Sequence, residues 1–458
     1  MATIRSLLAA LPAAITPPMA RPRLSMGELL RDCAALLSGR GEASGVALGT
    51  SILERYASLK PEARARILGA LSAGRFGADR RRLDEAITRY REHPDAATTL
   101  ALHKAAEPRR QELIRRLNLA PGGTSALVRM REDLIAAMAG QGRSSDLAAV
   151  DADFVHLFSS WFNRGFLLLK RIDWTTPAHI LEKIIRYEAV HQINSWDELR
   201  ARLEPADRRC FAFFHPTLED EPLIFVEVAL HGTIPDAIAP VLAAGRVPTD
   251  PTKATTAVFY SISNCQVGLK GVSFGNFLIK QVVEELRREF PSLDTFVTLS
   301  PVPGFMRWIA RARAARNPAP FTPDDVALLR LLDAAGWHRD PASQKALKPV
   351  LQNAIAYYLL VARDRAGSAL DPVARFHLGN GACLVRVNWM GDISDNGIAQ
   401  ECGFMVNYHY ILDQIEHNHE VFANRGEVAT VHAVKRLLRD PEPLLRRHAR
   451  TSRAASGT

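Results

Sequence analysis

The stretch 256–300 reads TAVFYSISNCQVGLKGVSFGNFLIKQVVEELRREFPSLDTFVTLS, and its composition changes three times along its length. β-Branched and aromatic residues dominate its two ends, glycine interrupts its middle, and apolar residues at helical spacing follow the glycines. These patterns predict a strand, a loop, a helix and a second strand, at Thr256–Ile262, Ser263–Phe274, Gly275–Phe290 and Thr295–Leu299. Two strands joined by a helix in this order run parallel in one sheet. The sequence therefore predicts an α/β domain.

The segments on either side extend this sheet and precede it with helices. Further strands are predicted at Phe211–Phe214, Leu223–Leu230 and Ala382–Trp389. Helical spacing with no strand-like alternation runs from residue 25 to about 188, and two helices, at about 397–416 and 427–439, end the fold. We therefore predict four parts: a flexible N-terminal arm at 1–24, an all-helical bundle at 25–188 for oligomerisation or as a scaffold, an α/β domain at 189–445, and a frayed tail at 446–458.

The composition is that of a soluble globular protein with a basic excess. The 458 residues include 58 Lys and Arg against 49 Asp and Glu, a formal net charge of +9. Much of the excess is Arg spread along helical stretches, so the sequence does not support a nucleic-acid groove. No apolar run is long enough to cross a membrane, and prolines interrupt the apolar N-terminus, which we interpret as an arm and not a targeting segment. We expect a cytoplasmic protein without a nucleic-acid or membrane partner.

The five cysteines are widely scattered and form no C-x-x-C motif. This usage suits a reducing compartment and offers neither a zinc site nor a redox pair. We therefore expect no metal ligands.

The glycine-containing loop has the properties of a phosphate site. It lies between a strand and the start of a helix, where unpaired amides and the helix dipole attract anions. Lys270 and Lys280 add positive charge. The spacing matches neither a dinucleotide-binding nor a Walker motif. On spacing alone, a glycine-rich turn without a ligand is equally compatible.

Ser300 follows the second parallel strand directly. Ligands of open α/β sheets bind beyond the carboxyl ends of the strands, so Ser300 and the glycine loop should face one crevice. The alternative is that Ser300 only caps the helix that follows. His377 lies beside glycine turns before the strand Ala382–Trp389. A histidine in such a place is more often structural than catalytic.

Taken together, these residues resemble the malonyl-CoA decarboxylase family. The resemblance covers most of the chain beyond about residue 125. It is carried by the following strings: Phe259-Tyr-Ser-Ile-Ser263, Gly275-x-Phe-Leu-Ile-Lys280, Arg288-Glu-Phe-Pro291, Leu299-Ser-Pro-x-Pro-Gly-Phe305, Phe376-His-Leu-x-Asn-Gly-Ala382, Asn388-Trp-Met-x-Asp392 and Asn407-Tyr408-x-Tyr410.

The resemblance implies a catalytic domain similar to the GCN5-related N-acetyltransferase fold, after an all-helical N-terminal domain. In that fold two parallel strands diverge and admit the pantetheine arm of CoA between them. Ser273 occupies the position of the first glycine in the acetyltransferase phosphate loop. This difference argues against acetyltransferase activity. The family's CoA-binding residues correspond to Lys270, Gly271, Val272, Ser273, Phe274, Gly275, Asn276 and Ile279. Its catalytic serine and histidine correspond to Ser300 and His377, which also contact substrate.

The implied reaction converts malonyl-CoA to acetyl-CoA and CO2 through a thioester enolate, a carboxy-lyase reaction. An enolate needs a fixed hydrogen-bond donor and a proton source, which Ser300 and His377 would supply. Arg386, Asn388 and Tyr408 are candidates for supporting roles, or for packing only. No cofactor is expected, because CoA is part of the substrate. The resemblance also suggests a homo-oligomer, a tetramer or dimer, and a role in fatty acid or malonate metabolism.

Two other functions remain open at this point. A CoA-dependent acyltransferase would use the same fold but would need an acyl acceptor. An acyl-CoA-binding protein without turnover would need neither Ser300 nor His377.

Overall fold

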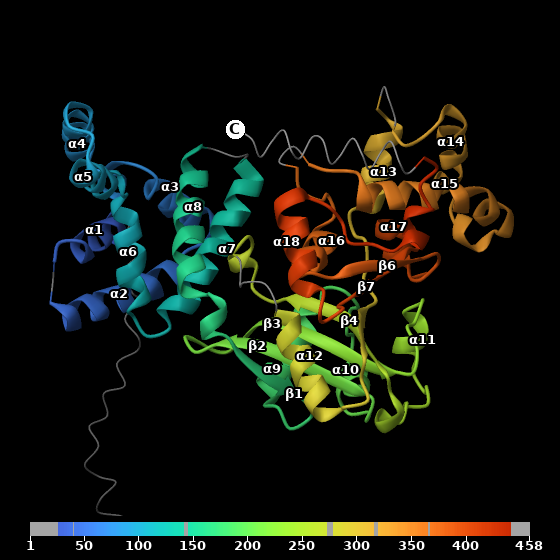
Figure 1. Cartoon of the computed structure of the whole chain (residues 1–458). Coiled ribbons are helices and arrows are strands. Elements are labelled where there is room, and N and C mark those ends of the chain that lie inside the picture. Colours follow the sequence, from blue (N-terminus) through green and yellow to red (C-terminus); the bar gives the residue numbers. More distant parts are fainter. Residues whose placement is uncertain are drawn as a thin grey trace, which may run out of the picture. The chain divides into compact units, whose positions relative to one another are not determined.

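The computed structural model describes residues 26–39, 41–141, 145–272, 278–315, 319–364 and 367–440. The chain divides into two compact units, and the boundary along the sequence lies between Phe158 and Ser159. Figure 1 shows the helices of the first unit in blue to teal and the sheet of the second in green to red. The arm predicted at 1–24 and the tail predicted at 446–458 lie outside the described residues.

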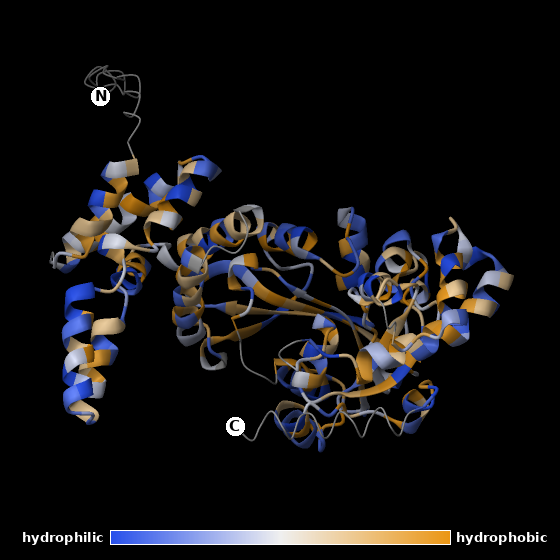
Figure 2. Cartoon of the chain, turned by 90° about the horizontal axis from the view of Figure 1, so that it is seen from above, coloured by the Kyte–Doolittle hydropathy of each residue, from blue (hydrophilic) through white to orange (hydrophobic). Residues whose placement is uncertain are grey.

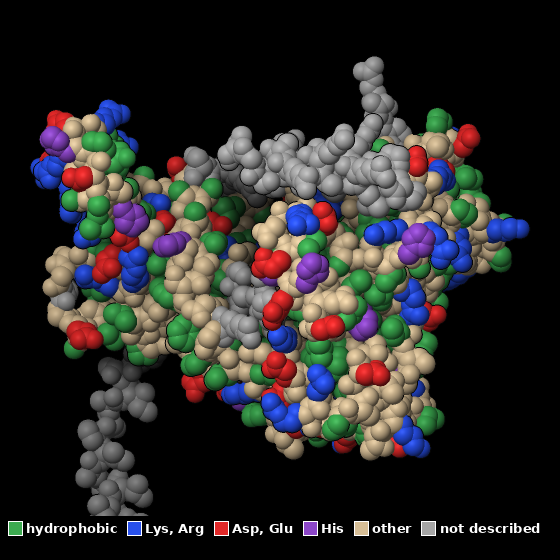
Figure 3. All heavy atoms as spheres, viewed as in Figure 1, with side chains coloured by type: hydrophobic (Ala, Val, Ile, Leu, Met, Phe, Trp, Pro, Cys, Tyr) green, Lys and Arg blue, Asp and Glu red, His purple; other side chains and the backbone are tan. Residues whose placement is uncertain are grey.

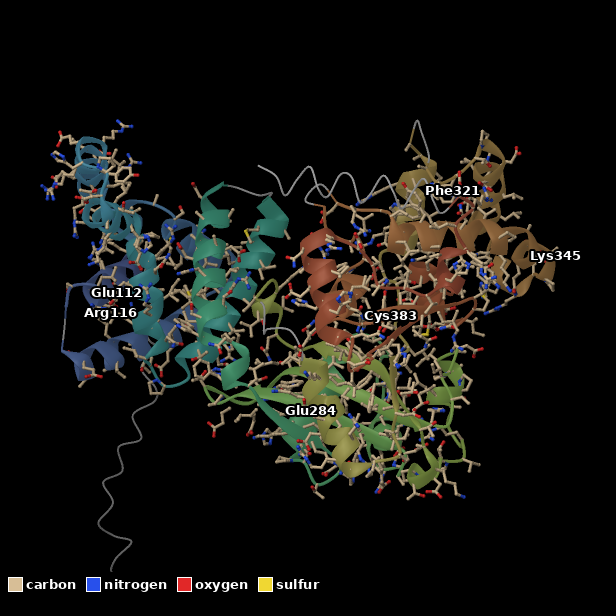
Figure 4. The ribbon with its side chains drawn as sticks, in the orientation of Figure 1. Glu112, Arg116, Glu284, Phe321, Lys345 and Cys383 are labelled. Atoms are coloured by element: carbon tan, nitrogen blue, oxygen red, sulfur yellow. The ribbon has the colours of Figure 1, made fainter. Side chains whose placement is uncertain are left out.

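The first unit is helical, as the sequence predicts. Its helices are α1 (Met26–Leu36), α2 (Glu42–Ala57), α3 (Pro61–Ala70), α4 (Arg80–Glu92), α5 (Ala96–Ala106), α6 (Arg109–Asn118), α7 (Gly123–Gln141) and α8 (Ser145–Trp161). Buried leucines and isoleucines on α1, α2, α3 and α6 form its core. The exposed side of α6 carries i,i+4 charge pairing, and Figure 4 labels one such pair, Glu112 and Arg116, whose charged atoms lie 2.7 Å apart.

The second unit is built on one seven-stranded mixed sheet in the order β1-β2-β3-β4-β5-β7-β6. The strands are β1 (Leu168–Ile172), β2 (Arg208–His215), β3 (Leu218–His231), β4 (Thr256–Asn264), β5 (Thr295–Thr298), β6 (Cys383–Asn388) and β7 (Met405–His409). Figure 2 shows the central strands mostly in the hydrophobic colour, which agrees with their nearly complete burial. Figure 4 labels Cys383, where β6 begins.

Helices cover both faces of this sheet. On one face, α9 (Ala178–Tyr187) and α10 (Trp196–Leu203) pack on alternate side chains of β2, including Cys210, Ala212 and Phe214. The other side-chain set of β2 meets α12 (Leu278–Glu289), where Arg209 lies 2.6 Å from Glu289. The two faces follow from the period-two alternation of a strand.

The pair of parallel strands that decides the fold is present. β4 and β5 are parallel, and their pairing covers only Thr256–Phe259 and Thr295–Thr298, so the later part of β4 runs on without β5 beside it. All the other neighbouring strands pair antiparallel. The prediction of a helical N-terminal region followed by an α/β domain with a parallel strand pair is confirmed.

The short helix α11 (Ala239–Leu242) lies between β3 and β4 in the chain. The helices of the C-terminal part are α13 (Phe305–Arg313), α14 (Pro323–Leu328), α15 (Pro341–Leu360), α16 (Pro372–Gly379), α17 (Asp395–Glu401), α18 (Ile415–Arg425) and α19 (His432–Lys435). Figure 1 shows α16 beside α18 at the β6–β7 end of the sheet, and the two helices pack together.

Two segments differ from the sequence prediction. The segment 159–188, which we placed in the helical bundle, contributes β1 and α9 to the sheet unit. Asn163 begins the turn that ends the helical run, since its side chain accepts a hydrogen bond from the amide of Gly165 at 3.0 Å. Strand formation there depends on pairing with β2, a tertiary effect that overrides local pattern.

The prediction of one helix at about 397–416 is also wrong. α17 stops at Glu401, because Cys402 and Gly403 both have positive φ, at 56° and 76°. The residues that follow form β7, which pairs with β6. The predicted helix at 427–439 shortens to α19.

Candidate functional site

Ser300 lies just past the end of β5, where the sequence prediction placed it. Its backbone N–H donates to the carbonyl of Val406 at 2.9 Å, and its carbonyl accepts from the Val406 N–H at 2.9 Å. Pro301 follows and has no N–H with which to continue the ladder. The side chain is only 5 % exposed. Ser300 is thus fixed by β7 and enclosed by the fold.

His377 reaches Ser300 from α16. Asp371 caps this helix by accepting hydrogen bonds from the amides of Val373 and Ala374, each at 3.0 Å. The Nε2 atom of His377 lies 3.1 Å from Oγ of Ser300, and its Nδ1 atom lies 2.8 Å from the hydroxyl oxygen of Tyr410. The expected contact between the Ser300 and His377 side chains is therefore present.

Burial determines the charge of this histidine. His377 is 2 % exposed, and loss of solvent lowers its pKa from 6.5 to about 3. The ring of Tyr408 stacks on the imidazole, with the ring centres 4.8 Å apart. Burial also raises the pKa of the Tyr410 hydroxyl. Ser300, His377 and Tyr410 therefore form a neutral hydrogen-bonded chain at ordinary pH.

A cleft of about 580 Å³ is lined on α16 by residues next to His377 in the chain, whereas Ser300 and His377 are not among its lining residues. The cleft is lined by Leu223 and Ile224 within β3, by the end of β4 and the loop after it, by the start of α12 and by α16. Lys270, Gly271 and Val272, which are predicted to bind CoA, line it, and Gly271 adopts φ 81°, which favours glycine. Arg375 and Phe376, which directly precede His377, also line it.

Of the rest of the predicted CoA-binding segment, the structure describes Ile279 alone. Ile279 is 1 % exposed and belongs to the buried side of α12. Ser273, Phe274, Gly275 and Asn276 lie outside the described residues. Lys280 is partly exposed and lies 3.3 Å from Glu416. Basic and acidic side chains are interspersed on the face drawn in Figure 3.

Arg386 and Asn388 do not join Ser300. Both donate to Oδ1 of Asn407, at 2.9 Å and 2.8 Å, and Arg386 also donates to the carbonyl of Ile234 at 3.0 Å. Asn407 in turn donates to the carbonyl of Thr298 at 2.8 Å. These three side chains, which we call the anchor cluster, connect β5, β6 and β7. They hold the sheet together below the site.

Sequence reasoning missed three residues near Ser300. Thr298 accepts a hydrogen bond from the Ser300 hydroxyl at 2.8 Å, Tyr410 contacts His377, and Arg375 lines the cleft. Alternation along 406–410 would have placed Tyr408 and Tyr410 on one face, had this segment been recognised as a strand. Tyr408, a predicted supporting residue, contacts His377 through its ring, and its buried hydroxyl has no hydrogen-bond partner among the residues that the structure describes.

The described residues contain no group of three or more His, Cys, Asp or Glu side chains arranged to hold a metal ion. The five cysteines are buried and unpaired. Among the described helices, none has both the length and the apolar character needed to span a bilayer.

Comparison with known proteins gives a consistent result. Residues 165–448 match the family model of the malonyl-CoA decarboxylase C-terminal domain, and residues 76–162 match that of the malonyl-CoA decarboxylase N-terminal domain. Mitochondrial malonyl-CoA decarboxylase of Anser anser anser is 37 % identical over 391 residues, which cover 78 % of this chain and 76 % of that protein. The protein of the same name from Rattus norvegicus is 36 % identical over 382 residues, 77 % of each chain.

Solved structures agree with these relatives. The crystal structure of malonyl-CoA decarboxylase from Rhodopseudomonas palustris is 55 % identical with a TM-score of 0.87, and the match covers 90 % of this chain and all of that one. The structure from Agrobacterium vitis is 57 % identical with a TM-score of 0.84 and the same coverage. The chain belongs to the malonyl-CoA decarboxylase family.

Proposed function

We propose that this enzyme, a carboxy-lyase by family, decarboxylates malonyl-CoA to acetyl-CoA and CO2 with Ser300 and His377 as its catalytic residues. The observation that carries the proposal is the 3.1 Å contact between Ser300 Oγ and His377 Nε2, at the buried end of the parallel strand pair. Both side chains are almost inaccessible to water. In a chain of this family, such a pair matches the chemistry that the reaction requires.

The chemical step breaks the bond between the carboxylate carbon and C2 of the malonyl group. The bonding electrons pass into the thioester and leave an enolate with its charge on the thioester oxygen. The Ser300 hydroxyl donates a hydrogen bond to that oxygen, which is the kind of interaction that contributes most to such reactions. A proton then adds to C2 and gives acetyl-CoA. The Nε2–H of His377 supplies this proton, directly or through Ser300, while Nδ1 takes the hydroxyl proton of Tyr410, so that the imidazole stays neutral and Tyr410 regains a proton from solvent.

The cleft supports CoA binding next to this pair. Lys270 and Arg375 are among its lining residues, and cations of this kind pair well with phosphate. Arg375 is two residues from His377 on the same helix. We infer that the phosphates of CoA bind at this cleft, next to the helix that carries His377.

The test is to incubate the purified chain with malonyl-CoA alone and to measure CO2 and acetyl-CoA. We expect equal amounts of the two products without any acceptor. Product formation that depends on an added acyl acceptor would instead support a CoA-dependent acyltransferase. Binding without any product would support an acyl-CoA-binding protein.

We also propose that the chain assembles with itself through the helical unit, and that it acts in the cytoplasm without a cofactor. Sedimentation of the full chain tests the first proposal, since a monomer would contradict it. Cell fractionation tests the second, because the names of two relatives place those proteins in mitochondria. Retention of turnover after treatment with a chelator tests the third.

A further inference from the structure

Thr298 lies two residues before Ser300, and the two side chains point to one face because side chains alternate along a strand. Thr298 is fully buried. Its Oγ1 accepts hydrogen bonds from the Ser300 hydroxyl at 2.8 Å and from the backbone N–H of Tyr408 at 3.1 Å. Its carbonyl accepts from Asn407 Nδ2 at 2.8 Å. Because β7 holds it at two points, the Thr298 hydroxyl oxygen is an acceptor in a fixed position.

The direction of the Ser300 hydroxyl decides which nitrogen of His377 carries the proton. A serine hydroxyl has one hydrogen, and here Thr298 receives it. Ser300 Oγ therefore accepts in its 3.1 Å contact with His377 Nε2, so this nitrogen is the protonated one. A neutral imidazole has a single N–H. His377 Nδ1 must then accept from the hydroxyl of Tyr410, 2.8 Å away.

We infer that Thr298 is a positioning residue: it holds the Ser300 hydroxyl hydrogen in the substrate-free enzyme and thereby keeps the His377 proton on Nε2, where catalysis uses it. Thr298, Ser300, His377 and Tyr410, which we call the relay cluster, donate in one direction, from Tyr410 toward Thr298. The role of this direction in catalysis rests on the proposed function, whereas the direction itself does not.

When substrate binds, only the last hydrogen bond of the relay cluster, from Ser300 to Thr298, changes its acceptor. The enolate oxygen is a charged acceptor and forms a stronger hydrogen bond than a neutral hydroxyl. Ser300 therefore turns its hydrogen from Thr298 to the enolate, while the His377 Nε2–H remains on Ser300 Oγ. Without Thr298, Ser300 in the free enzyme would donate to Nε2 instead. The His377 proton would then lie on Nδ1, on the side away from Ser300 and the substrate.

The direction can be tested by ¹⁵N NMR of the full chain with labelled histidine, recorded without substrate. Subtraction of the His377→Asn spectrum assigns the His377 signals. We expect the Nε2–H tautomer, and an Nδ1–H tautomer in the wild-type protein would overturn the inference. This outcome does not depend on whether malonyl-CoA is the substrate. It is decided by the wild-type spectrum even when a Thr298 variant fails to fold.

The role of Thr298 can be tested with Thr298→Val and Thr298→Ser. We expect Thr298→Val to shift His377 to the Nδ1–H tautomer and to lower kcat about tenfold to a hundredfold with little change in KM. Thr298→Ser should keep the wild-type tautomer and turnover. Thr295→Val is the matched control on the same strand, because the Thr295 hydroxyl bonds only to the exposed Asp294 side chain.

Two results separate the inference from the proposed function. A Thr298→Val protein that folds and keeps both wild-type kcat and the Nε2–H tautomer would overturn the inference alone. A wild-type protein that releases no CO2 from malonyl-CoA would overturn the proposed function, while the NMR spectrum still decides the direction of the relay cluster.

Discussion

The relay cluster and the anchor cluster lie on opposite faces of the same strands, and they use their hydrogen bonds differently. In the relay cluster, Ser300, His377 and Tyr410 bond through their side chains only to other side chains. In the anchor cluster, Arg386 and Asn407 donate to backbone carbonyls as well. Side chains that donate hydrogen bonds to backbone carbonyls stabilise the fold. Side chains that bond only to one another can exchange a hydrogen-bond partner for a substrate. This contrast predicts where substitutions affect turnover and where they affect stability.

Ser300→Ala should give the largest effect. Removal of the hydroxyl takes away the donor to the enolate, and loss of one such donor lowers kcat by about 10² to 10³. Release of CO2 from malonyl-CoA measures the loss, and a thermal unfolding curve shows whether the variant folds. A folded Ser300→Ala protein with full turnover would remove Ser300 from the mechanism.

His377→Asn should lower kcat by about a hundredfold. Because burial lowers the pKa of His377 to about 3, the imidazole is neutral above about pH 4, and we expect no change in wild-type turnover near pH 6.5 from its titration. A steep loss of kcat centred there that disappears in His377→Asn would contradict this assignment.

The same pKa affects stability. The pKa of His377 is about 3 in the folded chain and 6.5 when unperturbed. Between these values the unfolded chain binds the additional proton, so the free energy of unfolding decreases as the pH falls from 6.5 toward 3. Unfolding temperatures of wild type and His377→Asn between pH 7 and 4 test this, since the variant should lose stability less steeply.

Tyr410→Phe should have an intermediate effect. It removes the donor to Nδ1 of His377 but leaves the ring and its packing in place, so kcat should fall about tenfold with little change in KM. Tyr187→Phe, on α9, is a control for loss of a tyrosine hydroxyl elsewhere in the unit. Equal kcat values in Tyr410→Phe and wild type would show that the Tyr410 contact is not needed.

Asn388→Ala, in the anchor cluster, should have the smallest effect on turnover. Asn407 Oδ1 keeps its hydrogen bond from Arg386, so no buried acceptor is left without a partner. We expect about 1 to 2 kcal/mol less stability and a kcat within about twofold of wild type. Chemical unfolding and CO2 release measure the two quantities. A large loss of kcat without loss of stability would place Asn388 in the site and break the contrast between the clusters.

The sequence was most informative where local pattern and tertiary structure agree. The β4–α12–β5 unit has strong local patterns at each step, so its parallel strands and the position of Ser300 followed directly. β1 and β7 are short, and each depends on a neighbouring strand for its conformation. Local helical periodicity therefore misled the prediction at both places.

The candidate site was predictable only in part, for a related reason. Ser300 followed from strand order, but His377 entered by resemblance, because 77 residues separate it from Ser300 along the chain. Thr298 and Tyr410 were missed because a hydroxyl gains its role from a partner that spacing does not reveal. The residues of the anchor cluster were visible as polar positions, yet sequence alone did not distinguish a structural amide from one that grips a substrate.

Tight packing around the turn after α16 makes this turn sensitive to mutation. The turn there passes through Gly381, which adopts φ 82°, and a Cβ at this position would lie 2.1 Å from the carbonyl oxygen of Ile415 at the start of α18. Any codon change that replaces this glycine must push α18 away or shift the helix that presents His377. A missense allele at Gly381 would therefore abolish activity without altering a single reacting group, and screens restricted to catalytic side chains would overlook it.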